Sequence, residues 1–190
     1  FLKVLENKEI SIETRKIVMQ GYTNIGKNGS EERIRMTKNL LTNISKFFIE
    51  TKSEFDENGS REKTKEGLSQ KEFNKKWKKL ENKTRIVKNR FKIIYPENNK
   101  LEFYLDVFTK GKLKGLVTIE TRPVSTKYKK DFKKFSINNI NWLKQELENN
   151  DFKNVNLVQK GLPEWTPIIV GNIKTLINNI ITLSNSSSLL

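Results

Sequence analysis

Apolar and polar residues alternate through much of the chain, most clearly between residues 101 and 122. In the stretch LEFYLDVF (101–108) the odd-numbered positions are apolar, and the even-numbered positions carry Glu102, Tyr104 and Asp106. This two-residue period is typical of a half-buried β-strand. Residues 116–122 alternate again after a glycine-containing turn at 109–112. The pattern predicts a β-hairpin in which Asp106 and Glu120 share one face.

The same period predicts further short strands along the chain. They cover residues 17–23, 32–36, 46–52 and 61–65, followed by a strand pair at 82–87 and 90–95. Turn segments that contain glycine and asparagine separate several of them, as at 24–31 and 56–60. About seven or eight short strands at regular spacing favour an antiparallel sheet that closes into a β-barrel. We therefore expect an α+β fold, mainly antiparallel β, with flanking helices.

Helical patterns interrupt and follow these strands. Ser69 and Glu72 form the pattern of a capping box, and two aromatic residues and a leucine follow at helical spacing. We therefore expect a helix over 70–80 that crosses one face of the sheet. Apolar stripes predict two more helices, at 138–148 and 173–183. The stripe of the last helix would pack either on the sheet or on a second chain, so an oligomer formed through it stays open.

The composition limits the chemistry of any site. The 190 residues include no cysteine and no histidine, which excludes disulfides, thiolate ligands and histidine-based catalysis. Any bound metal must be held by oxygen atoms, which favours Mg²⁺, Mn²⁺ or Ca²⁺. No run of 18 apolar residues occurs, and the chain starts without a signal-peptide pattern. We therefore expect a cytoplasmic location and no membrane span.

The chain is strongly basic, because 37 lysines and arginines face 22 acidic residues and give a net charge of +15. Such an excess favours polyanionic partners: nucleic acid, polyphosphate, nucleotides or an anionic membrane surface. A solvated lysine-rich surface is the alternative interpretation. Arg33 and Arg35 argue for a site, since residues two apart on a strand point to the same face.

The order of short motifs along residues 1–160 resembles the CYTH family, also called triphosphate tunnel metalloenzymes. The resemblance rests on the order and spacing of the motifs together. The matching segments are Gln20-Gly21-Tyr22, Arg33-Ile34-Arg35, Thr51-Lys52, Ser60-Arg61, Lys83-Thr84-Arg85, Asp106-Val107-Phe108, Gly115-Leu116 and Glu120. The C-terminal segment of the family is echoed by Trp142-Leu143, Phe152, Asn154 and Leu157.

The resemblance implies an eight-stranded antiparallel β-barrel that forms a tunnel over residues 1–160, with 161–190 as a helical extension of the same domain. Members of the family include inorganic triphosphatases, thiamine triphosphatases, class IV adenylate cyclases and, more distantly, RNA triphosphatases. They share a basic set of residues that grips a triphosphate and an acidic set that binds a divalent metal.

Carried over to this chain, the resemblance assigns a role to each set. The expected triphosphate-binding residues are Arg33, Arg35, Lys52, Arg61, Lys83 and Arg85. The expected ligands of Mg²⁺ or Mn²⁺ are Glu120, Asp106, Glu102 and Glu50, with Glu120 and Asp106 as the catalytic carboxylates. A metal that bridges two phosphates would polarise the γ-phosphorus for attack by water.

The chain departs from the family on the acidic side. The family's N-terminal Glu-x-Glu-x-Lys precedes a Phe-Leu pair, so we expect it just upstream of Phe1. Lys63 and Lys65 stand where the family often has acids, and Arg122 stands in place of the last acid. The first hypothesis is a Mg²⁺- or Mn²⁺-dependent hydrolase of inorganic tripolyphosphate, or of nucleoside or thiamine triphosphate. The alternatives are a non-catalytic module that binds polyphosphate, nucleotide or RNA, an adenylate cyclase, and an RNA 5′-triphosphatase.

Overall fold

The structure, a computed structural model, describes residues 11–57, 60–94, 101–125, 127, 153–163, 177–180 and 182. Among these residues, seven strands form one antiparallel sheet in the order β4-β3-β2-β1-β5-β6-β7. The strands are β1 (Ser11–Ile25), β2 (Glu31–Asn39), β3 (Ser45–Lys52), β4 (Lys63–Gly67), β5 (Arg85–Ile94), β6 (Leu101–Phe108) and β7 (Val117–Pro123). The helices are α2 (Gln70–Lys79) and α4 (Asn154–Lys160), and two short 3-10 turns are η1 (Asn82–Thr84) and η2 (Gly111–Leu113).

Most of the predicted strands are confirmed. The β6–β7 hairpin pairs Tyr104 with Glu120 and Asp106 with Thr118, so Asp106 and Glu120 do share a face. β1 begins at Ser11, before the predicted residue 17, because its first half pairs with β5. The strand pair predicted over 82–95 is instead the turn η1 followed by one strand, β5. Lys88, Asn89 and Arg90 do not break this strand.

The sheet is open in the part of the chain that the structure describes. Among the described strands, β4 pairs only with β3, and β7 only with β6. The closed barrel of eight strands expected from the resemblance is therefore not formed by these seven strands. Closure requires the outermost strands to pair, and β4 offers an edge of only five residues.

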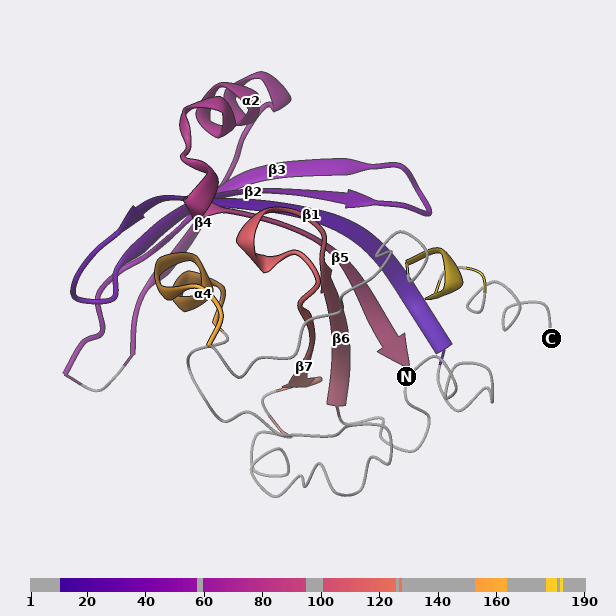
Figure 1. Cartoon of the computed structure of the whole chain (residues 1–190). Coiled ribbons are helices and arrows are strands. Elements are labelled where there is room, and N and C mark those ends of the chain that lie inside the picture. The colour runs from indigo at the N-terminus through magenta and orange to yellow at the C-terminus, as the bar shows by residue number, and fades with distance from the viewer. Residues whose placement is uncertain are drawn as a thin grey trace.

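The sheet is curved, and the two helices lie on its opposite sides (Figure 1). α2 covers the outer face, where Phe73 is 2% exposed and its ring lies 5.4 Å from the ring of Phe47. α4 lies beneath the arch, on the side that we call the concave face. The sheet therefore separates two surfaces, and each is partly covered by a different helix.

Local sequence explains where α2 begins and how it docks. The predicted capping box is present: Ser69 Oγ accepts from the Glu72 backbone N–H at 3.2 Å, and Glu72 Oε2 accepts from the Ser69 backbone N–H at 2.8 Å. At the other end, Leu80 and Trp77 lie over Gly21 of β1. A Cβ atom on Gly21 would lie 2.1 Å from Leu80 Cδ1, so the missing side chain lets the helix approach the sheet.

The sequence pattern did not predict α4, which packs on the concave face near one end. With seven residues it depends on tertiary contacts for stability. These contacts come from a buried cluster made of Tyr22, Ile86, Phe108, Leu113, Leu116 and Leu157. The same cluster closes the space between the sheet and the β6–β7 connection.

Two other helices were predicted. The one at 138–148 lies outside the described residues. Of the helix at 173–183, residues 177–180 and 182 are described and helical, and Ile180 is 1% exposed. Among the described residues, no helix has both the length and the apolar character needed to cross a membrane.

Candidate functional site

Charged side chains occupy the concave face across the whole width of the sheet. Directly opposite residues on neighbouring strands share a face, so the register identifies them from β4 to β7. The set is Lys16, Glu31, Arg33, Arg35, Lys46, Glu50, Lys52, Lys63, Lys65, Lys88, Arg90, Lys92, Glu102, Asp106, Glu120 and Arg122. Eleven of these residues are basic and five are acidic, so the face carries a net positive charge.

Arg33 and Arg35 of β2 share a carboxylate of β3. Arg33 Nε donates to Glu50 Oε2 at 2.7 Å, and Arg35 Nη1 lies 3.7 Å from the same oxygen. Burial alone would raise the pKa of Glu50, but the positive charges of Arg35 and Arg33 outweigh burial and lower it. Glu50, expected as a metal ligand, is thus ion-paired with two residues of the expected triphosphate-binding set.

A buried carboxylate, Glu31, contacts further basic residues of this half of the sheet. Lys52 Nζ donates to Glu31 Oε1, and the same oxygen lies 3.7 Å from Arg33 Nη1 and 3.9 Å from Arg61 Nη2. The Arg61 guanidinium also lies 4.8 Å from the Phe55 ring centre. Four of the expected triphosphate-binding residues, Arg33, Arg35, Lys52 and Arg61, therefore lie together around Glu31 and Glu50.

The Arg35 guanidinium is oriented by a neutral hydrogen-bond acceptor, the Gln20 side chain on the neighbouring strand β1. Both Nε and Nη2 of Arg35 donate to Gln20 Oε1, the first at 2.9 Å, and Gln20 Nε2 donates to the Tyr22 hydroxyl at 2.8 Å. Burial, followed by repulsion from Arg33, lowers the pKa of Arg35 to about 10. Its positive charge is therefore only partly compensated by Glu50, which favours an additional anion beside it.

On the other half of the sheet, Asp106 of β6 is the centre of a buried ion cluster. Lys88 Nζ lies 2.6 Å from Asp106 Oδ2, while Arg90 donates from Nε to Oδ1 at 2.7 Å and from Nη2 to Oδ2 at 2.6 Å. This two-bond geometry is the strong form of an arginine–carboxylate pair. Burial would raise the pKa of Asp106, but the hydrogen bonds from Arg90 and the charge of Lys88 lower it.

Lys88 and Arg90 respond differently to the same carboxylate. The Lys88 side chain is 3% exposed, and burial lowers its pKa to about 8 despite the attraction of Asp106. Burial also opposes the charge of Arg90, but its bonds to Asp106 and the charge of Glu120 raise the pKa of Arg90 overall. Arg90 is thus a permanent cation of the cluster, whereas the charge of Lys88 depends on pH near the physiological range.

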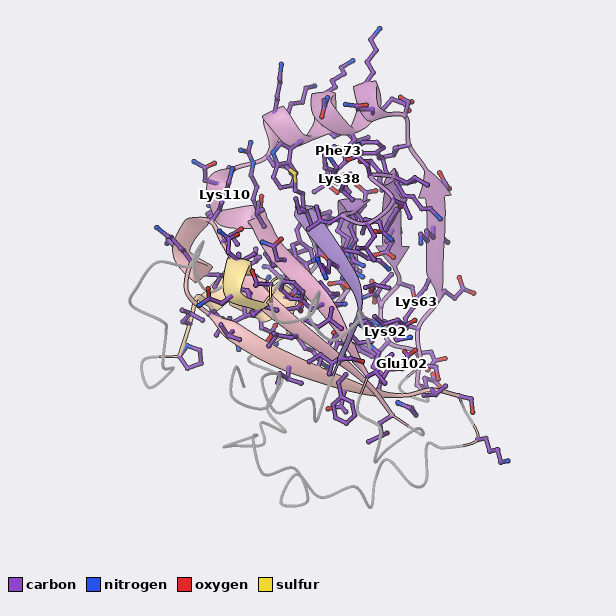
Figure 2. The ribbon with its side chains drawn as sticks, turned by 90° about the vertical axis from the view of Figure 1, so that its right-hand side faces the viewer. Lys38, Lys63, Phe73, Lys92, Glu102 and Lys110 are labelled. Carbon is purple, nitrogen blue, oxygen red and sulfur yellow. The ribbon has the colours of Figure 1, made fainter. Side chains whose placement is uncertain are left out.

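Glu120 and Glu102, the remaining candidate metal ligands, are also paired with basic groups. Glu120 Oε2 accepts from Arg90 Nη2 at 2.9 Å, and Glu120 Oε1 lies 2.6 Å from Arg122 Nη2. Glu102 Oε1 lies 3.0 Å from Lys92 Nζ, and the two residues are labelled close together in Figure 2. Among the described residues, no group of three or more acidic side chains is arranged to hold a metal ion.

Two of the candidate metal ligands nevertheless converge at one point. Asp106 Oδ2 and Glu120 Oε2 both contact the same atom, Nη2 of Arg90. The guanidinium of Arg90 therefore lies between two carboxylates that the resemblance assigns to a metal. These two side chains could supply oxygen ligands to a divalent cation only if Arg90 moved away from them.

Aromatic rings lie among the cations of the concave face. The Phe48 ring centre is 4.0 Å from Lys65 Nζ and 5.9 Å from the Arg35 guanidinium. The Tyr104 ring centre is 5.3 Å from the guanidinium carbons of both Arg90 and Arg122. Contacts of this kind hold the cations in fixed positions without neutralising them.

Lys83 and Arg85, although expected at the site, join neither the cluster around Glu31 and Glu50 nor the cluster around Asp106. Arg85 Nη2 donates to the backbone carbonyls of Trp77 at 2.7 Å and Leu80 at 2.6 Å, so it caps the C-terminal end of α2 on the outer face. Lys83 lies on η1 with a 66% exposed side chain and pairs with Glu81 at 2.8 Å. Arg85 therefore has a structural role in fixing α2, whereas the Lys83 side chain is exposed to solvent.

Sequence reasoning missed the basic residues that do reach the concave face from β5. Lys88, Arg90 and Lys92 recur every second residue, which places them on one face of a strand. The alternation is present in the sequence. It was not recognised because the predicted strands ended at residue 87 and began again at residue 90, which left Lys88 between them. Gln20 and Tyr22 were matched only as a motif, and their contact with Arg35 depends on the pairing of β1 with β2.

Comparisons with known proteins add little to this geometry. No family model matches the chain, and no curated protein matches it. Among solved structures, the chain is similar to the PH1819 protein from Pyrococcus horikoshii OT3, with a TM-score of 0.44 and 15% identity over 70% of this chain and 78% of that chain. The resemblance to the CYTH family therefore stays a prediction.

Proposed function

We propose that the concave face binds the triphosphate group of a small polyanion. The observation that supports this function is that two ion clusters lie on the same face, one on each half of the sheet. Arg35 and Arg33 come from β2 and Arg90 from β5, and the charge of Arg90 contributes to lowering the pKa of Arg35. An anion with several phosphates would reach both clusters at once and relieve this repulsion.

The chemistry of the side chains suits phosphate oxygens. A guanidinium presents planar pairs of N–H donors that match two oxygens of one phosphate. In the structure, carboxylate oxygens of Glu50 and Asp106 occupy such donors. An incoming phosphate would exchange places with these internal partners, or share the donors with them. The net positive charge of the face favours this exchange.

Binding is tested by titrating the intact chain with tripolyphosphate in the presence of a chelator. We expect saturable binding that is much tighter than binding of sulfate or citrate at matched ionic strength. Replacing Arg33 and Arg90 together by Gln should abolish this preference, since it removes one arginine from each cluster. Equal binding of all three anions, or full retention of binding by the double variant, would overturn the proposal.

A second candidate function is metal-dependent hydrolysis of the bound triphosphate. The observation that favours it is the convergence of Asp106 and Glu120 on a single atom of Arg90. If the triphosphate drew Arg90 towards its own oxygens, these two carboxylates would be released together. They would then be the residues to hold Mg²⁺ or Mn²⁺, which supplies polarisation of the phosphorus when bound. Closure of the sheet into a tunnel would require β4 and β7 to pair, directly or through a further strand, and neither proposal depends on closure.

Hydrolysis is tested by measuring phosphate release from tripolyphosphate with Mg²⁺, with Mn²⁺ and with chelator. We expect metal-dependent release that Glu120→Gln abolishes while binding in chelator is largely retained. Binding without release under every metal condition would leave the non-catalytic module as the function. ATP, thiamine triphosphate and 5′-triphosphorylated RNA, tested in parallel for phosphate and cyclic AMP, would separate the hydrolase, cyclase and RNA triphosphatase alternatives.

A further inference from the structure

The exposed side of α2 carries a concentrated positive charge that the concave face does not use. The ten-residue helix contains five lysines and one glutamate. Lys71, Lys75, Lys78 and Lys79 line one broad, shallow depression together with Gln70 and Asn74. We call these four residues the α2 lysine face. In the described part of the chain, none of the four has an ion pair with an acidic residue.

The spacing of these lysines places them on one side of the helix. Positions 71, 75, 78 and 79 differ by four, three and one, so they cover two turns of a single face. Figure 2 shows long, nitrogen-tipped side chains extending from this helix away from the sheet, while Phe73 lies beneath it. The apolar side of α2 is buried, so the exposed face has no apolar anchor for insertion into a lipid surface.

The helix is held firmly, so the lysine face has a fixed direction. The ring of Phe73 stacks on that of Trp77 at 5.6 Å, and the Arg85 guanidinium lies 5.2 Å from the Trp77 ring centre. Leu80 contacts the backbone of β1 at Gly21. The capping box fixes the first turn. An anion that binds this face would therefore not need to order the helix.

Helix stability explains only part of this lysine pattern. Basic residues in the last turn, such as Lys78 and Lys79, interact favourably with the helix dipole. Lys71 lies in the first turn, where a positive charge is unfavourable to the dipole. Glu72, the acidic residue of the helix, is engaged with Ser69 and points its charge at the helix start. The lysine face is therefore more basic than the helix requires.

We propose that the α2 lysine face binds the phosphodiester backbone of a nucleic acid, independently of the concave face. From Lys71 to Lys79 the helix rises by about 12 Å, which corresponds to about three successive phosphates along one strand of a duplex. Lysine contributes as a point charge that needs no fixed base, so the contact is independent of sequence. Charge complementarity and the missing apolar anchor together favour a nucleic acid over a lipid surface.

The test uses the intact chain and 20-nucleotide probes with a 5′-hydroxyl: single-stranded RNA, single-stranded DNA and the corresponding duplexes. Excess tripolyphosphate is present to occupy the concave face. The variant replaces Lys71, Lys75, Lys78 and Lys79 by Gln. The matched control replaces Lys27, Lys110, Lys112 and Lys114 by Gln, which removes the same charge from exposed positions on other loops and turns.

We expect the α2 variant to bind the preferred probe at least about tenfold more weakly at 100 mM salt, and the dependence of log affinity on log salt to be shallower by about two to three. The control should lose less than about threefold. Comparing the affinities for the single-stranded and duplex RNA and DNA probes identifies the preferred nucleic acid.

Equal losses in variant and control would mean that net charge alone attracts the probe, and would overturn the proposal. So would a failure of the intact chain to bind any probe at 50 mM salt. Binding to phosphatidylserine vesicles that is lost in the variant, with nucleic acid binding unchanged, would assign the face to a membrane. Because tripolyphosphate binding is measured separately, failure of this proposal is distinguishable from failure of the proposed function.

Discussion

At the scale of single residues, Arg35 is the cation of the concave face that is best prepared to receive an anion. Its guanidinium is oriented by the neutral acceptor Gln20, and Glu50 approaches it only to 3.7 Å. Arg90, by contrast, is already bound twice by Asp106. The two arginines therefore differ in how much of their charge is available, although both lie on the same face.

We predict that Arg35→Ala weakens tripolyphosphate binding by about 1.5–3 kcal/mol, which is roughly ten- to a hundred-and-fifty-fold, because a hydrogen bond between charged groups is lost. Isothermal titration measures this change. Arg85→Ala is the control, since Arg85 lies on the outer face and should leave the affinity within about twofold. An unchanged affinity for Arg35→Ala would remove this residue from the site.

Lys88 makes stability depend on pH in a defined direction. Burial lowers the pKa of Lys88 to about 8 in the folded chain, against 10.5 for an ordinary lysine. Between these values the folded state has released a proton that the unfolded state still binds. The contribution of this group to the free energy of unfolding therefore rises as pH increases from about 8 to about 10.5.

Urea denaturation of the intact chain and of Lys88→Met at several pH values tests this. The difference in unfolding free energy between the two should grow in favour of the intact chain across that window, since Met cannot titrate. A difference that stays constant would show that Lys88 keeps its proton in the folded state. Comparing the two chains removes the contributions of groups that titrate in both.

At the scale of elements, the contact between α2 and β1 depends on a residue without a side chain. Gly21 accepts Leu80 and Trp77 directly on its backbone. We predict that Gly21→Val destabilises the chain by about 1–3 kcal/mol, because the new methyl groups force α2 away from the sheet. Denaturant unfolding measures the loss. Gly67→Val is the control, since no atom lies within 4 Å of a Cβ placed there.

Elements also differ in how far the sequence predicts them. The β6–β7 hairpin and the start of α2 follow from local patterns: strict alternation in one case and a capping box in the other. β5 was divided because its inward-facing positions are charged, and charged positions are expected to face water. α4 was missed because its seven residues are stabilised by the cluster around Leu157, and that cluster comes from four distant segments.

In the candidate site, too, features that depend on a single strand or hairpin could be predicted from the sequence, and features that depend on tertiary contacts could not. The shared face of Arg33 and Arg35 and that of Asp106 and Glu120 could be predicted, because each depends on one strand or one hairpin. The outward direction of Arg85 could not, since it follows from the start of β5 and from the carbonyl groups of α2. The engagement of every candidate metal ligand by a cation likewise depends on how the strands pair.

At the scale of the whole molecule, the net charge of +15 predicts a general response to salt. A ligand that binds only the folded chain stabilises it by about 2.7 kcal/mol at a concentration one hundred times its dissociation constant. We predict that tripolyphosphate in chelator raises the unfolding temperature, and that 0.5 M NaCl strongly reduces the shift because the Debye length falls well below 10 Å. A salt-independent shift would argue against an electrostatic site.

The strand order has a consequence for how the site is assembled. β1 to β4 and β5 to β7 are each a meander in which consecutive strands are neighbours, and among the described strands β1 and β5 form the one pairing between non-consecutive strands. The cluster around Glu50 belongs to the first meander, and the cluster around Asp106 belongs to the second. Each ion cluster can therefore form within its own meander during folding, but the two clusters come onto one face only after β1 has paired with β5. A polyanion that binds both clusters would link the two groups of strands across the β1–β5 pairing. It would therefore slow their separation during unfolding more than it slows the local opening of any single hairpin.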